Sequence, residues 1–243
     1  MHLYEQIEEL RRQQTRPSET RKPILLLDID DTLIDCRHRK HKVFMDFIAQ
    51  AEVRRTFSTE CDQLAALSPE AVRYRVHDNL KSLQIKNQEF AAALFDFWRQ
   101  HYFTFPYLIQ DQAFPGAVPF VERSHRSGLA LVYLTGRDQA GMGRGTFESL
   151  TQLGFPTQGP DIHFMLKPDV NMGDFEFKRL ALEEVAQLGP VIAAFENELG
   201  NLNAMAQRFP EAAVYWRKTL YAPDPPEPHE RVQILFDFPS PPL

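Results

Sequence analysis

Short apolar runs alternate with segments of helical periodicity along most of this chain. The runs lack regular polar alternation, which is typical of strands buried on both faces of a parallel sheet. The segments between them place apolar residues three and four apart, as amphipathic helices do. Strands are expected at 24–27, 129–134, 162–166, 191–195 and 212–216, and helices at about 143–153, 175–188 and 202–208. This alternation predicts an α/β fold, a parallel sheet with helices on both faces.

The segment between the first two predicted strands has a different pattern. Residues 36–111 show helical periodicity at 43–51, 68–83 and 87–101, and no strand signal. Ser68 is a suitable N-cap for the second helix, with Pro69 at its first position. The segment is far longer than an ordinary crossover, so it is expected to be an all-helical module of its own. The predicted domains are therefore 1–35 with 112–243, and 36–111.

Both ends of the chain lie outside this pattern. Residues 3–14 predict a short amphipathic helix outside the core, and 15–22 a linker into the first strand. The tail from Leu220 is rich in proline, so its first part is expected to be extended. Residues 232–238 alternate apolar and polar positions, which indicates either an edge strand or a segment packed over the core.

Composition narrows the possible partners. The chain has 243 residues, a net charge of −6 and two cysteines. The negative charge gives no global attraction to nucleic acid or an anionic membrane, so neither partner is expected. The polar N-terminus does not resemble a signal peptide, and no apolar run is long enough to span a bilayer. A cytoplasmic protein is the interpretation.

Three carboxylates come directly after the first predicted strand: Asp28, Asp30 and Asp31. Acidic groups at the end of a buried strand are costly unless something cationic lies there, and ligands of open α/β sheets bind at this edge. Oxygen ligands on a short acidic loop suit Mg²⁺, which shares its shell with waters and phosphate. The basic run 37–42 that follows is either a solvated helix start or a rim that attracts an anionic substrate.

Other polar residues follow the later strands. Thr135, Gly136 and Arg137 come after the second strand, and Glu196 and Asn197 after the fourth. Because the carboxyl ends of parallel strands meet at one edge, these groups are expected near the aspartates. Gly136 permits close approach to the backbone. Arg137 is expected to contact a substrate or to pair with an acid, either the next residue or one from the helical module.

The first motif resembles that of the haloacid dehalogenase (HAD) superfamily, in which four apolar residues precede Asp-x-Asp-x-Thr. Asp28, Asp30 and Thr32 occupy those places, and the later polar residues follow in the order that the superfamily requires. The resemblance extends over 24–216 apart from the helical module. It implies a HAD-like Rossmannoid core, in which residues 36–111 would be an α-helical cap over the active site.

The resemblance also implies roles in phosphoryl transfer, which needs an in-line nucleophile and neutralisation of charge. Asp28 would attack phosphorus and form an aspartyl-phosphate. Asp30 would protonate the leaving oxygen and then deprotonate water. Thr135 would hydrogen-bond a phosphate oxygen. Magnesium would be held by Asp28, Asp30, Glu196 and Asn197, and the substrate would be contacted by Thr32, Gly136 and Arg137.

Two lysines compete for the third motif of the superfamily. Lys178 lies near the start of a predicted helix, at a spacing from Glu196 that allows one helix and one strand. Lys167 lies at the end of the third strand in a Lys-Pro pair, which resembles the version of another subgroup. We prefer Lys178, whose ammonium would neutralise Asp28 and the phosphate together.

The fourth motif departs from the pattern. Many superfamily members have two aspartates there, whereas this chain has Glu196 and the neutral Asn197. One charge fewer weakens Mg²⁺ binding without removing the ligands. The resulting hypothesis is a Mg²⁺-dependent phosphohydrolase acting on a small phosphorylated metabolite. The alternatives are a phosphotransferase or phosphomutase of the same superfamily, and a degenerate module that binds phosphate or a partner without turnover. Processing of nucleic-acid ends is disfavoured by the net charge.

Overall fold

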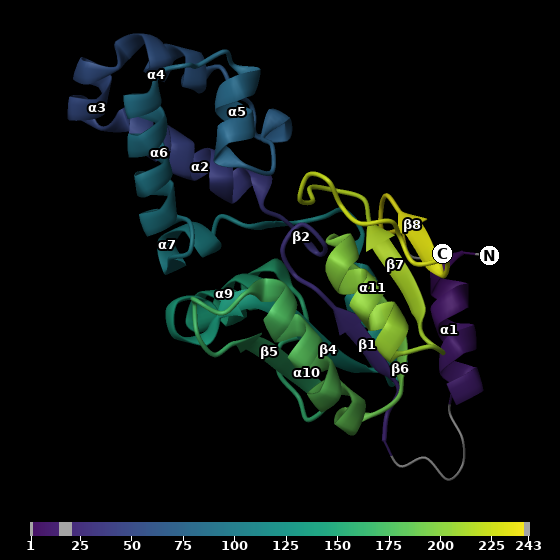
Figure 1. The fold of residues 1–243 in the computed structure, drawn as a ribbon. Coiled ribbons are helices and arrows are strands. Elements are labelled where there is room, and N and C mark those ends of the chain that lie inside the picture. The colour runs from purple at the N-terminus through teal and green to yellow at the C-terminus, as the bar shows by residue number, and fades with distance from the viewer. Residues whose placement is uncertain (1, 15–20, 241–243) are drawn as a thin grey trace.

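A computed structural model describes residues 2–14 and 21–240 (Figure 1). Most of the predicted linker 15–22 lies outside the described residues. A six-stranded sheet forms the centre, and every neighbouring pair of its strands is parallel. In spatial order the strands are β5 (Ile162–Lys167), β4 (Ala130–Asp138), β1 (Ile24–Leu27), β6 (Val191–Glu196), β7 (Ala213–Arg217) and β8 (Val232–Leu235). The predicted α/β fold class is confirmed.

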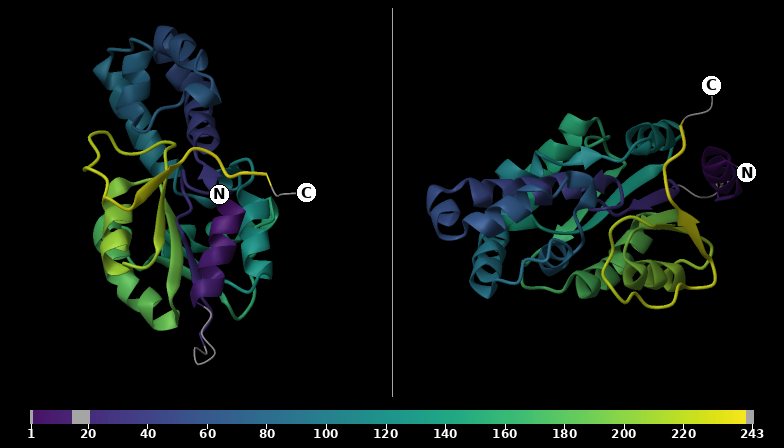
Figure 2. Two further views of the ribbon diagram at one scale, coloured as in Figure 1. Left: turned by 90° about the vertical axis from the view of Figure 1, so that its right-hand side faces the viewer. Right: turned by 90° about the horizontal axis from the view of Figure 1, so that it is seen from above.

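Helices cover both faces of the sheet (Figure 2), because successive side chains of each buried strand point to opposite faces. In β1, Leu25 and Leu27 belong to one apolar cluster, and Ile24 and Leu26 to the other. The first cluster includes residues of α1 (Leu3–Gln14), α8 (Ala117–Arg126) and α9 (Gln139–Leu153), and the second those of α10 (Asp174–Leu188) and α11 (Leu199–Arg208). The strand order reverses at β1, which places its carboxyl end at a topological switch point.

The predicted N-terminal helix is confirmed as α1. It lies outside the alternation of strands and helices, yet Leu3, Tyr4 and Ile7 are buried in the first apolar cluster. The helix packs beside β6. The sequence of the helix does not identify the surface that it covers, since an amphipathic stripe can pack on any apolar surface.

Residues 37–108 form helices and no strand. These are α2 (Arg37–Ala49), α3 (Ala51–Thr56), α4 (Ser58–Ala65), a 3₁₀ turn at Pro69–Ala71, α5 (Val76–Ser82), α6 (Gln88–His101) and α7 (Phe105–Leu108). We call α2–α7 the helical insertion. It has an apolar cluster of its own, built around Phe44, Phe47 and Phe90, and it projects beyond one end of the sheet (Figure 1). Short strands β2 (Ile34–Asp35) and β3 (Gln112–Ala113) pair where the chain enters and leaves it. The division into two domains stays a prediction.

The predicted helix over 68–83 is wrong in its first half. Only α5 is α-helical there, and Ser68 makes no side-chain cap. Asn79, in α5, accepts a hydrogen bond from the backbone N–H of Arg73 through its Oδ1. Its Nδ2 donates to the backbone carbonyls of Arg73 and Arg75. Lys40 donates to the carbonyls of Arg73 and Tyr74, at 3.1 and 2.6 Å. These side-chain bonds hold residues 72–75 extended, since they take backbone groups that a helix would use.

The proline-rich tail ends as part of the sheet. Both expectations for 232–238 are confirmed in part: β8 is an edge strand that pairs in parallel with β7, and Phe238 packs in the first apolar cluster. The guanidinium of Arg217, which is fully buried, donates to the carbonyls of Thr32 and Leu235. The tail is thereby tied to the loop after β1. Cys36 and Cys61 are both buried and free, and no helix in the described part of the chain is long and apolar enough to cross a membrane.

Candidate active site

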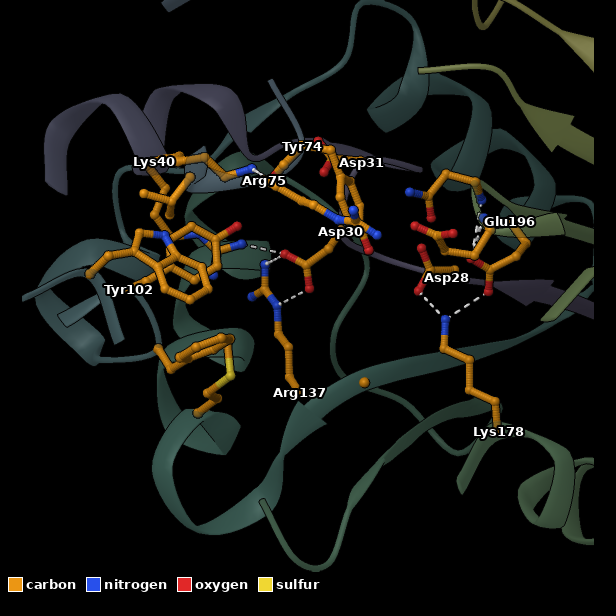
Figure 3. A pocket seen from close by; sticks show the side chains of 18 of the residues that line it. Asp28, Asp30, Asp31, Lys40, Tyr74, Arg75, Tyr102, Arg137, Lys178 and Glu196 are labelled. Carbon is orange, nitrogen blue, oxygen red and sulfur yellow. Dashed lines mark hydrogen bonds and ion pairs between the residues drawn. The ribbon is translucent and has the colours of Figure 1, made fainter. Parts of the chain in front are cut away.

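A cavity of about 340 Å³ lies between the carboxyl ends of the central strands and the helical insertion. Asp28 and Asp30 come from the end of β1, Gly136 and Arg137 from β4, and Glu196 and Asn197 from the end of β6. The strands bring these groups together because parallel strands end at the same edge. Figure 3 shows the labelled side chains around this cavity.

Asp28 is buried and in contact with one ammonium group. Lys178 Nζ donates to Asp28 Oδ1 at 2.6 Å and to Glu196 Oε2 at 2.7 Å (Figure 3). Burial raises the pKa of Asp28, and the charge of Lys178 opposes that rise. Burial followed by the charge of Asp28 raises the pKa of Glu196 to about 8. Burial alone would lower the pKa of Lys178, but the two carboxylates raise it, so its ammonium stays charged.

The remaining oxygens of these carboxylates also have partners. The Thr32 hydroxyl donates to Asp28 Oδ2 at 2.6 Å and lies 3.3 Å from Asn197 Oδ1. Glu196 Oε1 accepts from the backbone N–H groups of Asn197 and Glu198. Thr32 was predicted to contact substrate. That contact stays a prediction. In the structure the Thr32 hydroxyl fixes the direction of Asp28, because Thr32 holds one carboxylate oxygen and Lys178 the other.

Asp30 lies in a different environment, a cluster of two aspartates and two arginines, in which Asp30 is half-buried and the other three residues are buried. Arg137 Nε donates to Asp30 Oδ2 at 2.7 Å, and Arg137 Nη2 to Asp30 Oδ1 at 2.8 Å (Figure 3). Arg39 pairs with the same carboxylate. Asp111 pairs with Arg137 at 2.8 Å and with Arg39 at 3.0 Å. Burial favours a higher pKa for Asp30, but the charges of Arg137 and Arg39 outweigh it and lower the pKa.

This cluster bears on two questions that the sequence left open. Arg137 pairs with an acid at the end of segment 36–111, not with its neighbour Asp138. Within the basic run 37–42, Lys42 is exposed, whereas Arg39 and Lys40 are buried and line the cavity, as the reading of a rim at the site expects. Attraction of an anionic substrate by this run stays a prediction. Arg39 and Lys40 also connect α2 to Asp30 and to the loop 72–75.

Thr135 and Gly136 lie in the last part of β4. Thr135 is fully buried, and its hydroxyl accepts from the backbone N–H of Arg137 at 3.2 Å. Gly136 lines the cavity, and a Cβ at that position would lie 2.5 Å from Asp174 Oδ2. A larger residue at position 136 would therefore displace the Asp174 carboxylate from its present position. The predicted phosphate contact of Thr135 stays a prediction.

The two candidate lysines have separate partners. Lys178 contacts Asp28 and Glu196, as described. Lys167 Nζ donates to Asp174 Oδ1 at 2.6 Å and to the Met172 carbonyl at 3.0 Å, so it holds the loop before α10. The positions favour Lys178 as the group that neutralises Asp28.

The side-chain oxygens at this edge of the sheet are of the type that a hard cation such as Mg²⁺ prefers as ligands. Among the described residues, no group of three or more His, Cys, Asp or Glu side chains could hold a metal. Mg²⁺, however, binds through one or two carboxylates with waters and substrate phosphate. Asp28 and Glu196 supply carboxylate oxygens, and Asn197 supplies an amide oxygen whose described contact is the 3.3 Å approach of Thr32. These donors suit Mg²⁺ better than a soft metal.

Several residues of the cavity and of the cluster around Asp30 escaped the sequence analysis. Arg39 was hidden in a basic run, and Asp111 was a lone acid at the second boundary of the insertion. The aromatic residues that line the cavity had the helical spacing of ordinary core residues. The sequence signal for Arg39 was its position directly after an acidic turn. That position does not distinguish an arginine in a buried ion pair from one in a solvated basic run.

Comparisons with known proteins support the fold. No family model matches the chain, and no curated protein sequence matches it. A protein of Clostridium difficile that is assigned as a phosphatase has a TM-score of 0.52, with 13% identity over 82% of this chain and 86% of that chain. Protein tyrosine kinase A of Mycobacterium tuberculosis has a TM-score of 0.50, with 14% identity over 89% and 93%. A haloacid dehalogenase-like hydrolase of Streptococcus pneumoniae has a TM-score of 0.48, with 15% identity over 82% and 85%.

Identities this low establish likeness of fold alone. The strand order with β1 at the switch point, and the acidic loop after β1, agree with the resemblance found in the sequence. The chain therefore shares the fold of the Clostridium difficile protein and of protein tyrosine kinase A.

Proposed function

We propose that this protein is a phosphohydrolase that cleaves a small phosphomonoester through an aspartyl-phosphate on Asp28. The observation that carries the proposal is the setting of this carboxylate. It lies at the cavity floor, at the end of the central strand, between the Lys178 ammonium and the Thr32 hydroxyl. A buried, fixed carboxylate beside a cation is suited to in-line attack on phosphorus.

In this proposal each neighbour has a separate task. Thr32 orients Asp28 by holding Oδ2, while Lys178 holds Oδ1. Lys178 offsets the negative charge of Asp28 and of the phosphoryl oxygens as they approach each other. The P–O bond to the leaving group breaks as the bond to Asp28 forms, and the leaving oxygen takes a proton from Asp30 or from solvent. Water then attacks phosphorus and gives up a proton, the bond to Asp28 breaks, and phosphate and the free carboxylate result.

Magnesium would be held by Asp28, the backbone carbonyl of Asp30, Glu196 and Asn197. A bound Mg²⁺ offsets the charge on the phosphoryl oxygens and helps to hold them in line. The protein also supplies a cation of its own at this place, because Lys178 of α10 contacts the Asp28 carboxylate.

The acid/base role proposed for Asp30 meets an obstacle in this arrangement. Both of its oxygens are bound by guanidinium groups, which stabilise the ionised form. A carboxylate held in that form is a poor proton donor. This observation also favours the second candidate, a module that binds phosphate without turnover, and the neutral Asn197 points the same way. Because protein tyrosine kinase A shares the fold, transfer of the phosphoryl group to an acceptor other than water is also to be tested.

A panel of phosphomonoesters assayed with Mg²⁺ separates these candidates. Wild type should release phosphate from some members, and Asp28→Asn from none. Binding without turnover in both proteins would instead favour the non-catalytic module. Phosphate appearing on an added alcohol, with little in solution, would favour transfer. The control is Asp62→Asn, a change at an exposed aspartate of α4.

A further inference from the structure

The cavity has a second wall that is apolar and comes from the helical insertion. We call it the aromatic wall, and it consists of Tyr74, Phe95, Trp98, Tyr102 and Phe103. Figure 3 shows Tyr102 on one side of the cavity and Lys178 with Glu196 on the other. A ligand with its phosphate at Asp28 therefore has the rest of its atoms in reach of aromatic rings.

Trp98 is at the centre of the wall. Its ring stacks on Tyr102 at a centroid distance of 4.9 Å and on Phe95 at 5.9 Å. Phe103 meets it edge to face at 5.4 Å. The Arg39 guanidinium lies over Tyr102, 4.3 Å from the ring centre. These contacts fix the directions of the rings before any ligand arrives, and a fixed surface loses little entropy on binding.

The wall is not simply the core of the insertion. That core is the cluster around Phe44, Phe47 and Phe90, which is closed without the wall, although Trp98 also packs against it. Phe95 is 49% exposed and Phe103 is 39% exposed. Exposed aromatic surface next to a polar floor is typical of a ligand site, because a flat ring that covers it removes apolar area from water.

One exposed cation of the cavity, Arg75, differs from the others within the part of the chain that the structure describes. Arg39, Lys40, Arg137 and Lys178 all have carboxylate or carbonyl partners. No hydrogen bond or ion pair of the Arg75 guanidinium occurs within the described residues. Figure 3 shows the Arg75 side chain extending from the insertion into the pocket. An unpaired guanidinium beside a phosphoryl site is suited to bidentate recognition of phosphate oxygens.

We propose that this pocket selects phosphomonoesters whose alcohol part carries a flat aromatic ring. This is the chemistry that aryl phosphates and nucleoside monophosphates share. The ring stacks on the aromatic wall, and Arg75 binds the phosphate from the side of the insertion. The inference rests on the proposed function, since it takes the phosphate to lie at Asp28. A cavity of about 340 Å³ suits a ligand of this size.

Binding is tested with Asp28→Asn, so that turnover does not interfere. Phenyl phosphate, a nucleoside monophosphate and glycerol phosphate are titrated by calorimetry and by quenching of tryptophan fluorescence. At least one aromatic ester should bind about tenfold more tightly than glycerol phosphate and quench Trp98, because stacking adds to affinity. Tighter binding of the nucleotide assigns a nucleobase pocket, and tighter binding of phenyl phosphate assigns an aryl pocket.

Single substitutions in the same background separate the two parts of the proposal. Phe95→Leu should reduce the preference for aromatic esters to about threefold or less, without changing the affinity for glycerol phosphate. Arg75→Gln should weaken all three esters and inorganic phosphate to the same extent. Phe236→Leu is the matched control, since Phe236 is exposed and lies outside the cavity. Circular dichroism establishes that each variant is folded.

Two results would overturn the proposal: equal affinity for aromatic and glycerol esters, or an aromatic preference that Phe95→Leu and Trp98→Leu leave intact. The outcome is distinct from that of the proposed function. If wild type hydrolyses glycerol phosphate and aromatic esters and binds them with equal affinity, this inference is rejected and the proposed phosphohydrolase activity is retained. Aromatic preference in binding with no turnover keeps the pocket and removes the phosphohydrolase.

Discussion

The two aspartates of the loop after β1 lie in opposite electrostatic surroundings. Asp28 and Glu196 share one ammonium, that of Lys178, so carboxylates outnumber cations there. Asp30 and Asp111 face two guanidinium groups, so the charges around them are balanced. We call these the acidic half and the balanced half of the site.

The difference indicates where chemistry can occur. A group with excess negative charge can accept a cation, a proton or a phosphoryl centre, because binding relieves the repulsion between its carboxylates. A balanced, mostly buried cluster has no such need, and removal of one member leaves an unpaired charge. The acidic half is therefore the candidate reaction centre. The balanced half connects α2 and Asp111, at the two ends of segment 36–111, to the core.

The largest expected effect is that of Asp28→Asn on turnover. Loss of the nucleophile should reduce kcat by about 10⁴-fold or more. The free energy of unfolding should not fall, because Lys178 keeps Glu196 as a one-to-one partner. Phosphate release and urea unfolding are the two measurements. Turnover within tenfold of wild type would remove Asp28 from the reaction, and a large loss of stability would show that the acidic half is structural.

Lys178→Met should come next in size. Removing the only cation of the acidic half should reduce kcat by about 10²- to 10³-fold, as loss of a charge-stabilising group does at other active sites. Lys167→Met is the matched control, since Lys167 holds only the loop before α10. Its kcat should change by less than about threefold. Equal losses in the two variants would refute the assignment of Lys178.

Asp111→Asn examines the balanced half. It leaves Arg39 and Arg137 with one aspartate, so the free energy of unfolding should fall by about 3 kcal/mol. Asp62→Asn, in an exposed pair with Arg54, should change it by less than about 1 kcal/mol. Urea denaturation measures both. If the two variants lose the same small amount, Asp111 does not hold the cluster together.

Much of this arrangement could be predicted from the sequence because buried strands and their ends have strong local signals. The run 24–27 and the carboxylates after it indicated the position of the reaction centre. The spacing of Lys178 from Glu196 fits one helix and one strand. In the structure the Lys178 ammonium contacts both Asp28 and Glu196. The parallel sheet followed from alternation alone.

The balanced half could not be predicted in the same way. Whether Arg39 is solvated or buried depends on where α2 lies against the core, and no local pattern encodes that position. The same is true of Asp111, whose partners are distant in sequence. The extended loop 72–75 was missed because Asn79 and Lys40 outweigh a good helix start at Ser68 and Pro69.

The smallest expected effect concerns binding of Mg²⁺ with a phosphate mimic to the acidic half. At ten times the dissociation constant, a ligand that binds only the folded state adds about 1.4 kcal/mol of stability. For a chain of this size the melting temperature should rise by roughly 3–6 °C. Glu196→Gln should reduce the shift because it lowers the negative charge of the acidic half, whereas Glu183→Gln, a surface change in α10, should leave it intact. Thermal scans with Mg²⁺ alone, the mimic alone and both together measure the shift. No shift in wild type under any condition would count against a cation site in the acidic half.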